Sequence, residues 1–563
     1  MARGIPLAEG TPMSPALPPA LRRTLRRTFG LTELRAGQAE VIDRVLAGRD
    51  TLAIMPTGAG KSLCYQLPAL HLDGTTVVVS PLISLMKDQA EKLEDAGVAA
   101  EQLNSAQSAS AQDASLTRIE QSASDVVFAT PERLVDPEFQ ALLAKGRVAL
   151  LVVDEAHCIS QWGHDFRPAY LGLGAALQAL GRPPVLALTA TATPDVVEDI
   201  RAQLGRPRLR VVHTGMYRDN LRLRAVQAVN DDEKFSQLQA ALARTPGSGI
   251  VYVSTVKVAE ALHERLLGAG ESVALYHGRL PAAQRHANQE SFMGGAVRVM
   301  VATNAFGMGI DKADIRFVVH YQLPGSPQAY YQEAGRAGRD GEAADCTLIF
   351  HRRDRQVQQF FLARKPLGVP DLRAVLGAVP SQAPAEGLHL PRTRVAAALA
   401  QLRAAGLVRH DATQGWRATT DAPVSDAALS ALVEDAERKA ERDHEALERM
   451  VFYAQTGFCR WRVLLQAFGE AVPFAQGCGH CDNCLRPPPA ATPGPLLGKD
   501  RPAERARALR RQAPPFTVGD VVTVPRLGDG EVLSLAGDEV TLRMRDGSER
   551  TFVASYVRRA RTA

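Results

Sequence analysis

Two adjacent carboxylates, Asp154 and Glu155, follow an apolar run over residues 149–153. Such a run is typical of a buried parallel strand, and open α/β sheets bind their ligands at the carboxyl ends of these strands. Asp154 could hold Mg²⁺, while Glu155 could orient and deprotonate a water that attacks a phosphate. The pair therefore favours metal-assisted phosphoryl chemistry. The alternative at this stage is an ordinary strand end at which Asp and Glu meet by chance.

A loop upstream has the composition needed to bind phosphates. The sequence MPTGAGKS over residues 55–62 follows an apolar strand pattern and opens a helical pattern. Its glycines allow backbone N–H groups to converge on phosphate at a helix N-terminus, its lysine can reach the β and γ phosphates, and its serine can ligate Mg²⁺. We therefore predict that the chain binds Mg-ATP. The predicted nucleotide-binding residues here are Thr57, Gly58, Gly60, Lys61, Ser62 and Asp154.

Four of the 7 cysteines lie near the C-terminus in the pattern C-x18-C-x2-C-x2-C. Four thiolates suit a closed tetrahedral Zn²⁺ site, and the short spacings allow backbone amides to face the sulfurs. His480 lies within the cluster, but a fourth cysteine makes it unnecessary as a ligand. The other cysteines, Cys64, Cys158 and Cys346, lie in apolar surroundings, which favours small core residues over reactive thiols. The predicted zinc ligands are Cys459, Cys478, Cys481 and Cys484.

Strands and helices must position these residues. Between residues 20 and 355, short apolar runs alternate with helical patterns, which predicts βαβ units and parallel sheets. The runs are too numerous for one sheet, and residues 203–215 suit a link between two halves. The sequence therefore predicts an α/β protein with two tandem parallel-sheet domains.

The pattern changes after residue 364. A helical pattern over 392–405, a glycine, and two short strand patterns that turn near residue 414 predict a winged-helix-like module, with a plain helical linker domain as the alternative. A highly charged helix and the cysteine cluster follow. The chain then continues through a Pro- and Arg-rich linker into short alternating strands broken by Gly-Asp turns, which predict a small barrel.

Composition limits the class of protein. Hydrophobic residues make up 45% of the chain and charged residues 23%, as in globular proteins. No apolar run approaches the ~20 residues of a membrane span, and residues 1–20 lack the apolar core of a signal peptide, so we expect a cytoplasmic protein without membrane contact. The net charge is +5, and residues 486–563 account for all of it with 14 Lys or Arg against 9 Asp or Glu. A DNA-contacting arm and a solvated linker both explain this basic tail.

The phosphate loop departs from the strict G-x-x-x-x-G-K-[ST] pattern, because Met55 replaces the first glycine. Its P-T-G-x-G-K-S form, together with the Asp-Glu-Ala-His of residues 154–157, resembles superfamily 2 helicases. Further motifs follow in family order, and the chain resembles RecQ-family DNA helicases over residues 25–355 and 445–486. The resembling segments include PLISLMKDQ (81–89), ATPERL (129–134), LTATAT (188–193), VATNAFGMGIDKADIRFVVH (301–320) and QEAGRAGRDG (332–341).

The resemblance implies that the two parallel-sheet domains are RecA-like and that the four-cysteine segment is a helical zinc module of the RecQ type. The winged-helix-like module and the small C-terminal β-barrel rest on the helix and strand patterns described above. The predicted domains are a flexible N-terminus (1–20), RecA-like helicase domain 1 (21–210), RecA-like helicase domain 2 (211–365), the winged-helix-like module (366–425), a RecQ-type zinc-binding module (426–486), a linker (487–514) and an SH3/Tudor-like barrel (515–563).

The resemblance also implies roles for single residues. Gln38 would bind the adenine edge and Arg35 would stack on its ring. Arg339, with Arg336 nearby, would supply a guanidinium to the transferring phosphoryl, and such a finger is worth ~10³ to 10⁵ in rate in related NTPases. The two arginines are three positions apart and would share one face of a helix; two surface arginines are the alternative. Because they come from the second lobe, hydrolysis would require closure of the cleft, and repeated closure would move DNA.

The segment SQWGHDFRPAY over residues 160–170 resembles the aromatic-rich loop of the family. Trp162 and Phe166 would stack on unpaired bases, at ~1 to 3 kcal/mol per base, while His164 and Arg167 would contact phosphate or the opposite lobe. Burial of the two aromatic rings in the core is the alternative. Arg133, in a segment that resembles a DNA-backbone motif, completes the predicted DNA-binding set.

We therefore predict a DNA-stimulated, ATP-dependent helicase that moves 3′ to 5′ on single-stranded DNA and unwinds duplexes and junctions in recombination, replication or repair. Its predicted cofactors are ATP, Mg²⁺ and Zn²⁺. The alternatives are an RNA helicase on the same engine, an ATP-driven DNA translocase and an inactive DNA-binding scaffold.

Two features depart from the family layout. The winged-helix-like module precedes the zinc module, and the last segment resembles the Tudor-like module of UvrD-type repair helicases, which implies a protein partner; a non-specific basic barrel is the alternative.

Overall fold

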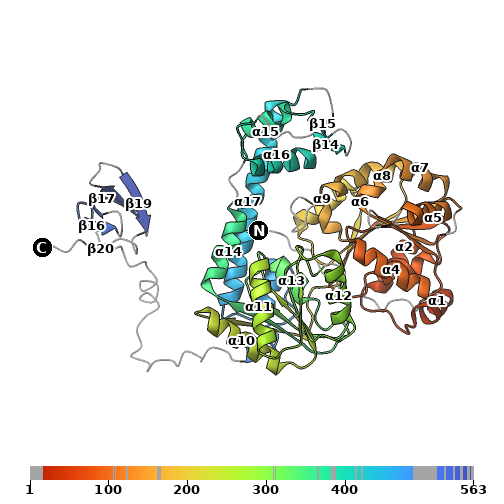
Figure 1. Ribbon diagram of the computed structural model, residues 1–563, viewed down its shortest axis with the longest axis horizontal. Helices are drawn as coiled ribbons and strands as arrows, with labels where there is room; N and C mark the ends of the chain where they lie inside the picture. Colours follow the sequence, from red (N-terminus) through yellow and green to blue (C-terminus); the bar gives the residue numbers. More distant parts are fainter. Residues whose placement is uncertain are drawn as a thin grey trace, which may run out of the picture. The chain divides into compact units, whose positions relative to one another are not determined.

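The computed structural model describes residues 17–104, 107, 109–121, 124–160, 167–307, 310, 312–363, 367–381, 388–411, 415–419, 423–485, 517–524, 528–536, 539–544, 549–553 and 558–559. Contacts group the chain into two compact units, residues 1–488 and 489–563. In Figure 1 the first unit carries both large sheets and the helices around them, while the second unit holds a small sheet of its own.

The first lobe is a parallel sheet with strand order β3-β4-β2-β5-β6-β1-β7. All residues of β1, β4 and β6 are buried, because helices cover both faces of the sheet, as parallel strands require. β7 pairs with β1, so the boundary predicted at residue 210 falls at the first residue of this strand. The strands are β1 (Thr51–Ile54), β2 (Thr75–Val79), β3 (Ala100–Leu103), β4 (Val126–Ala129), β5 (Val148–Val153), β6 (Val185–Thr189) and β7 (Arg210–His213).

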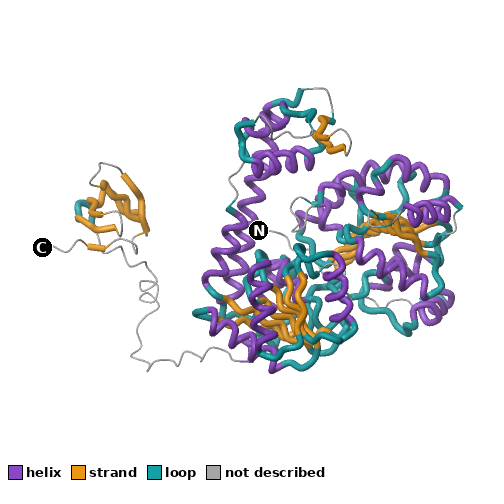
Figure 2. The backbone as a smooth tube through the Cα atoms, viewed as in Figure 1, coloured by secondary structure: helices purple, strands orange, loops and turns teal. Residues whose placement is uncertain are grey.

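Apolar side chains on the two faces of this sheet form two separate core clusters. Figure 2 shows the strands of the sheet lying between its helices. The helices of the lobe are α1 (Pro19–Phe29), α2 (Gln38–Leu46), α3 (Leu63–Ala69), α4 (Ile83–Asp95), α5 (Ala109–Glu120), α6 (Pro131–Leu134), α7 (Pro137–Lys145), α8 (Leu173–Ala179) and α9 (Pro194–Gln203), with short 3-10 helices η1 (Ala156–Ile159) and η2 (Pro168–Gly172).

The second lobe is also a parallel sheet, with strand order β10-β11-β9-β12-β13-β8. Three of its helices begin after a capping residue, Asn230, Thr255 or Ser326, whose side-chain oxygen accepts a hydrogen bond from the N–H three residues further on. The elements are β8 (Leu221–Gln227), α10 (Asp231–Arg244), β9 (Ser248–Tyr252), α11 (Val256–Gly268), β10 (Val273–Tyr276), α12 (Ala282–Met293), β11 (Val299–Ala302), β12 (Ile315–His320), α13 (Pro327–Ala334), β13 (Ala344–Phe350) and α14 (Arg352–Leu362).

The segment that carries Arg336 and Arg339 is not helical, contrary to the expectation that these side chains share a helix face. α13 ends at Ala334, and the next residues form turns. Gly338 has a φ of +57°, in the left-handed region that glycine adopts without strain. The helix therefore stops before the two arginines, and their side chains can point in different directions.

A helical zinc region follows, made of α17 (Asp426–Gln455), α18 (Arg460–Ala467) and α19 (Asp482–Leu485). Its apolar side chains and those of the second lobe form one core cluster. Trp461 is 1% exposed and its Nε1 donates a hydrogen bond to the main-chain oxygen of Leu221, 3.2 Å away. The hydroxyl of Tyr453 donates to that of Tyr330 across 3.0 Å. The zinc region and the second lobe are therefore one packed body.

Between the second lobe and the zinc region lie α15 (Val369–Gly377), α16 (Arg392–Ala404) and the antiparallel pair β14 (Val408–Asp411) and β15 (Gly415–Ala418). These elements have a core cluster of their own, which also takes in Leu429 near the start of α17. A helix followed by a two-stranded hairpin is the arrangement that motivates the winged-helix assignment, and that assignment stays a prediction.

The second unit is an antiparallel sheet with strand order β19-β18-β17-β16-β20. Its small core contains Val522, Val532 and Leu542. The fold class is confirmed for the two parallel sheets, the helical zinc region and this small antiparallel sheet. The strands are β16 (Val521–Val524), β17 (Gly528–Ala536), β18 (Glu539–Met544), β19 (Glu549–Val553) and β20 (Arg558–Arg559).

Among the described residues, no helix combines the length and the apolar character needed to cross a bilayer.

Candidate functional site

The phosphate loop lies between β1 and α3, and both of its glycines adopt left-handed backbone conformations. The φ angles are +85° at Gly58 and +75° at Gly60. A Cβ atom at Gly60 would lie 2.6 Å from Nε2 of Gln38, and one at Gly58 would lie 3.0 Å from Cγ of Arg339. Glycine is therefore required at both positions by backbone conformation and by close neighbours.

Gln38 and Arg35, predicted to bind adenine, are tied to the phosphate loop. The Nε2 atom of Gln38 donates to the main-chain oxygens of Ala59 at 3.1 Å and Gly60 at 2.9 Å, and its Oε1 accepts the N–H of Arg35 at 2.7 Å. Arg35 in turn donates from Nη1 to the oxygen of Gly58. The two residues thus brace the loop, and their contact with adenine stays a prediction.

Lys61 lies where its ammonium group is influenced by both acids of the Asp-Glu pair. Its Nζ donates to the main-chain oxygen of Met55 at 3.2 Å. Burial lowers the pKa of Lys61, Glu155 and Asp154 act to raise it, and Arg339 acts to lower it further. Lys61 therefore lies within electrostatic range of Asp154, Glu155 and Arg339.

Asp154 directly follows β5, which is where the sequence predicted a metal carboxylate. Its Oδ1 accepts the N–H of Glu155 at 3.0 Å, and its Oδ2 lies 3.5 Å from the hydroxyl of Ser80. Burial, followed by repulsion from Glu155, raises the pKa of Asp154 to about 7. Such a buried acid suits a ligand of Mg²⁺, and the ion would supply charge neutralisation at the β and γ phosphates. The phosphate loop and Asp154 therefore fit Mg-ATP.

Glu155 has an unusual backbone conformation and an unsatisfied buried oxygen. Its φ is +48°, a left-handed conformation that costs a residue with a side chain ~1–3 kcal/mol and that clusters at functional sites. Its Oε2 accepts no hydrogen bond from the described residues, although Nδ1 of His157 lies 3.3 Å away. A buried carboxylate oxygen without a donor is suited to holding and orienting a water.

Sequence reasoning missed the contact between His157 and the end of β6. The Nδ1 atom of His157 is 3.0 Å from the hydroxyl of Thr189, which itself donates to the main-chain oxygen of Thr191 at 3.0 Å. The residues belong to the Asp-Glu-Ala-His segment and to LTATAT, so both segments were noticed. Their pairing was not, because it depends on β5 lying beside β6 in the sheet.

The two candidate finger residues point to different places. Arg339 lies against the phosphate loop, because its Cγ is 3.0 Å from the position that a Cβ on Gly58 would occupy. Arg336 is 5% exposed and donates from Nη1 to the main-chain oxygen of Gly307 within its own lobe. The geometry therefore favours Arg339 as the group that would reach a phosphate, and gives Arg336 a place inside the second lobe.

The predicted DNA-binding residues are only partly within the described structure. Trp162, His164 and Phe166 lie outside the described residues. Arg167 donates from Nη1 to the main-chain oxygen of Pro81 at 3.1 Å, which joins the aromatic-rich segment to PLISLMKDQ. Arg133 lies in α6, the short helix that follows β4, and forms an ion pair with Asp136 at 2.7 Å. The DNA roles of all five residues stay predictions.

A pocket of about 700 Å³ is lined by residues of both lobes and of α17. Its walls include His157 and Thr191 from the first lobe, Arg336 and Gln322 from the second, and Arg449 from α17. The pocket is therefore bordered by His157 of the Asp-Glu-Ala-His segment and by Arg336, and its lining includes no residue of the phosphate loop.

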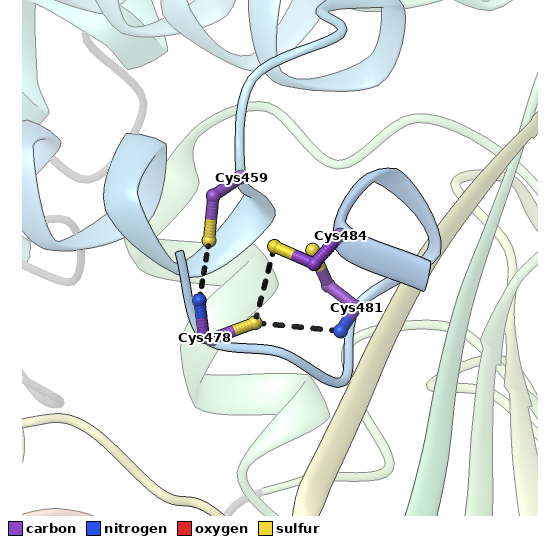
Figure 3. Close-up of side chains that lie close together, drawn as sticks. All are labelled: Cys459, Cys478, Cys481 and Cys484. Atoms are coloured by element: carbon purple, nitrogen blue, oxygen red, sulfur yellow. Dashed lines mark hydrogen bonds between the residues drawn. The ribbon is translucent and has the colours of Figure 1, made fainter. Parts of the chain in front are cut away.

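The four predicted zinc ligands converge, with their sulfur atoms all within 4.8 Å of one another. Figure 3 shows Cys459 facing Cys478, with Cys481 and Cys484 closing the cluster. The Sγ atoms of Cys478 and Cys484 are 3.9 Å apart, close to the ~3.8 Å edge of a tetrahedron with Zn–S distances of ~2.3 Å. The four thiolates therefore fit Zn²⁺.

Backbone amides face these sulfurs, as the spacing predicted. The N–H of Cys478 donates to Cys459 at 3.4 Å, and that of Cys481 donates to Cys478 at 3.3 Å. Gly477 is required here, since a Cβ atom would lie 2.7 Å from the sulfur of Cys484. By contrast, burial raises the pKa values of Cys64 and Cys346 to about 12, which suits unreactive core thiols.

The contacts that Glu470 makes outside the zinc region were not predicted from the sequence. It lies just beyond α18, and its Oε1 is 2.9 Å from Nε2 of His213 at the end of β7 in the first lobe. Its Oε2 accepts the N–H of Met216, in the segment between the lobes, at 3.0 Å. The zinc region therefore contacts the link between the lobes. No local pattern could signal these contacts, because more than 250 residues separate Met216 and Glu470.

Comparison with known proteins places the chain in a family. It matches the family models DEAD/DEAH box helicase over residues 35–200, Helicase conserved C-terminal domain over 233–341 and RecQ zinc-binding over 424–485. It is 35% identical over 483 residues to the ATP-dependent DNA helicase RecQ of Synechocystis, covering 83% of this chain and 98% of that protein. The chain belongs to the RecQ family.

A second RecQ relative and one solved structure extend this comparison. The chain is 39% identical over 462 residues to the ATP-dependent DNA helicase RecQ of Bacillus subtilis, which covers 82% of this chain and 66% of that protein. It therefore spans just under two thirds of the length of that relative. The crystal structure of the DUF1998 helicase MrfA bound to DNA matches 74% of this chain and 64% of that chain, with 17% identity and a TM-score of 0.51. This last likeness shows the shared fold alone.

RecQ membership agrees with the chemistry of the site. The RecQ zinc-binding match covers all four clustered cysteines, so Zn²⁺ is the metal that the donor set and the family both support. The DEAD/DEAH match spans the phosphate loop and the Asp-Glu pair, which supports ATP with Mg²⁺ as the nucleotide cofactor.

Proposed function

We propose that this RecQ-family chain is an ATP-dependent DNA helicase that moves 3′ to 5′ along one strand and unwinds duplexes and junctions during recombination, replication or repair. The observation that carries the proposal is that Arg339, from the second lobe, lies against the phosphate loop, with its Cγ 3.0 Å from the position that a Cβ on Gly58 would occupy. A site assembled from two lobes couples hydrolysis to relative movement of those lobes.

The roles of single residues follow from their positions. Lys61 would bind the phosphates, and Ser62 and the buried carboxylate of Asp154 would hold Mg²⁺, which would neutralise charge on the phosphates. Glu155 orients the attacking water with its unsatisfied Oε2 and accepts a proton from it. Arg339 stabilises charge on the transferring phosphoryl group, and Arg336 fixes the second-lobe segment beside it.

DNA is the proposed substrate because the relatives named above are DNA helicases. Trp162 and Phe166 would stack on unpaired bases, and His164, Arg167 and Arg133 would contact phosphate, so that contact with DNA next to Asp154 and Glu155 would trigger hydrolysis. The alternative, an RNA helicase on the same engine, is decided by which polymer stimulates hydrolysis.

Three further assignments complete the proposal. The domain boundaries are those predicted from the sequence, with residues 366–425 as a winged-helix-like module that separates strands. The barrel of residues 515–563 binds a protein partner. The cytoplasm is the proposed compartment, because the DNA of the bacteria that carry the two RecQ relatives named above lies there.

The decisive experiment measures ATP-dependent opening of two matched duplexes, one with a 3′ tail and one with a 5′ tail, with hydrolysis followed in the presence of single-stranded DNA or RNA. We expect only the 3′-tailed duplex to open, and only DNA to stimulate hydrolysis. Lys61→Ala should abolish both activities, whereas Lys145→Ala, an exposed lysine paired with Glu120, should change neither.

Each other outcome contradicts a specific part of the proposal. Strong hydrolysis without opening of either duplex would indicate a translocase, and stimulation by RNA alone would indicate an RNA helicase. Hydrolysis that is absent from the unmodified chain, or unchanged in Lys61→Ala, would mean that the chain is a DNA-binding scaffold.

A further inference from the structure

The segment between the two lobes is held rigidly just before Arg218. The N–H of Met216 donates to Glu470 at 3.0 Å, and its main-chain oxygen accepts the hydroxyl of Tyr331 at 2.7 Å. The ring of Tyr217 packs edge-on against Trp461, with centroids 5.1 Å apart. The main chain on the N-terminal side of Arg218 is therefore fixed by α13 and by the zinc region together.

The guanidinium group of Arg218 binds a row of main-chain oxygens. Nη1 donates to Gly335 at 2.8 Å, and Nη2 donates to Ala337 at 3.0 Å and to Gly338. Nη1 also donates to Thr57 of the phosphate loop at 3.3 Å. One side chain thus contacts both the turn that precedes Arg339 and the loop that would bind the phosphates.

These oxygens need such a partner because of where they lie. α13 ends at Ala334, so carbonyl groups in and just after its last turn lack donors within the helix and carry the partial negative charge of its C-terminus. A planar guanidinium has several donors in a fixed fork and can satisfy two or three neighbouring oxygens at once. A lysine ammonium presents its donors from one point and cannot span the same set.

Asn220 holds the same turn through further hydrogen bonds. Its Nδ2 donates to Gly338 at 2.8 Å and to Glu342 at 2.9 Å. A Cβ atom at Gly338 would lie 2.5 Å from Nδ2 of Asn220, so the close approach requires glycine at this position. The main chain on the N-terminal side of Arg339 is therefore held by two side chains of the interlobe segment.

We propose that Arg218 is a positioning residue for ATP hydrolysis, which holds the turn of residues 335–338 so that Arg339 reaches the γ-phosphate. This inference rests on the proposed function, because it concerns the same reaction. Arg218 itself does not contact the reacting atoms. It acts on the main chain that carries Arg339 and joins that main chain to Thr57.

The size of the effect follows from the geometric demands of the reaction. A displacement of a catalytic group by about 1 Å can cost about 10²-fold in rate. Removal of the guanidinium leaves up to four carbonyl groups without this donor, and the turn is expected to relax by a distance of that order. Nucleotide binding depends on the phosphate loop, so the loss should fall on kcat and leave KM for ATP within about twofold.

The test compares Arg218→Gln with Arg222→Gln, which makes the same change at an exposed arginine of β8. Steady-state hydrolysis with saturating single-stranded DNA gives kcat and KM, and a fluorescent ADP analogue is titrated with and without fluoroaluminate, which mimics the transferring phosphoryl. We expect Arg218→Gln to lose about 10²-fold in kcat and to lose the gain in ADP affinity that fluoroaluminate gives the unmodified chain. ADP affinity without fluoroaluminate should be unchanged.

The outcomes separate this inference from the proposed function. If the unmodified chain hydrolyses ATP and Arg218→Gln matches it in kcat and in the fluoroaluminate effect, Arg218 does not position the finger. If kcat and plain ADP affinity fall together, the role of Arg218 is merely structural and the inference is overturned. Absence of hydrolysis in the unmodified chain would instead contradict the proposed function.

If Arg218→Gln fails to fold, Arg218→Lys replaces it in the same measurements. Lysine keeps the charge but lacks the planar fork of donors, and the same criteria apply to it.

Discussion

The two halves of the proposed ATP site are held in place by different means. On the first lobe, Asp154 and Glu155 directly follow β5, and Gln38 braces a phosphate loop only 21 and 22 residues away. On the second lobe, Arg339 lies beyond the end of a helix, in a turn held by Arg218 from 117 to 120 residues away. The first half is built by a strand, a loop and a helix in succession. The second half depends on contacts made by the interlobe segment and the zinc region.

The strongest test of this comparison removes one reacting group from each half. Arg339→Ala should lower DNA-stimulated hydrolysis by about 10³-fold or more, and Glu155→Gln by about 10² to 10⁴-fold. Binding of a fluorescent ADP analogue should persist in both, because the phosphate loop is intact. Arg336→Ala is the comparison for the finger, since Arg336 faces Gly307 within its own lobe. Loss of plain ADP binding in Arg339→Ala, or activity within tenfold of the unmodified chain, would show that the finger is misassigned.

Loss of the metal should act mainly on the second half. Cys478→Ser removes one of four thiolates, and folding coupled to Zn²⁺ binding in small zinc peptides is worth about 10–16 kcal/mol. We expect zinc content to fall below one ion per chain, the thermal transition to move down, and hydrolysis to fall while the first lobe still binds the ADP analogue. His480→Ala is the matched control, because His480 lies between two ligands without belonging to the cluster. Zinc loss in that control would mean that the ligand set is wrong.

Replacement of glycine by alanine should have different effects at two positions in the turn around Arg339. Gly338 and Gly341 both have positive φ angles, but a Cβ would collide with Asn220 and Glu342 at Gly338 and would meet open space at Gly341. Gly341→Ala should cost only the ~1–2 kcal/mol of a left-handed backbone. Gly338→Ala should cost more and should also lower kcat by about tenfold to 10²-fold, because the turn moves. Denaturant unfolding and steady-state hydrolysis measure the two effects, and equal kcat values in the two variants would contradict the importance of this turn.

The smallest expected effect concerns the contact between the zinc region and the first lobe. Glu470→Gln weakens the pairing with His213 and with the N–H of Met216, which should cost about 1–3 kcal/mol of unfolding free energy. Glu448→Gln breaks an ion pair whose side chains are 45% and 52% exposed, and exposed pairs are worth about 0–1 kcal/mol. Urea unfolding of both variants makes the comparison. Equal losses would show that the buried contact does not stabilise the interlobe segment.

Much of the first half of the site could be predicted from the sequence because its signals are local. The apolar run before Asp154 predicted a buried strand, and β5 ends at Val153. The loop from Thr57 to Ser62 lies between β1 and α3, as its flanking patterns indicated. The zinc cluster could likewise be predicted, because three of its cysteines lie within seven residues of sequence, and the four sulfurs do converge.

The second half could not be predicted to the same depth. The spacing of Arg336 and Arg339 suggested one helix face, but α13 ends at Ala334 and the side chains diverge. Which arginine faces the phosphate loop depends on the turn at Gly338 and on Arg218, and no periodicity reports a contact between an interlobe segment and a helix end. The pairing of Glu470 with His213 was hidden for the same reason, because it joins segments whose proximity exists only after both lobes have folded.

The core shared by the second lobe and the zinc region has a consequence for synthesis on the ribosome. β13, the last strand of the sheet, is complete at Phe350, whereas Tyr453, Trp461 and Leu465, which fill the same core, emerge more than 100 residues later. At about 5–20 residues per second, the face of the lobe that carries Tyr330 waits roughly 5–20 s for its covering side chains. During this interval the nascent second lobe exposes an apolar face of the kind that chaperones bind, until the side chains of the zinc region cover it.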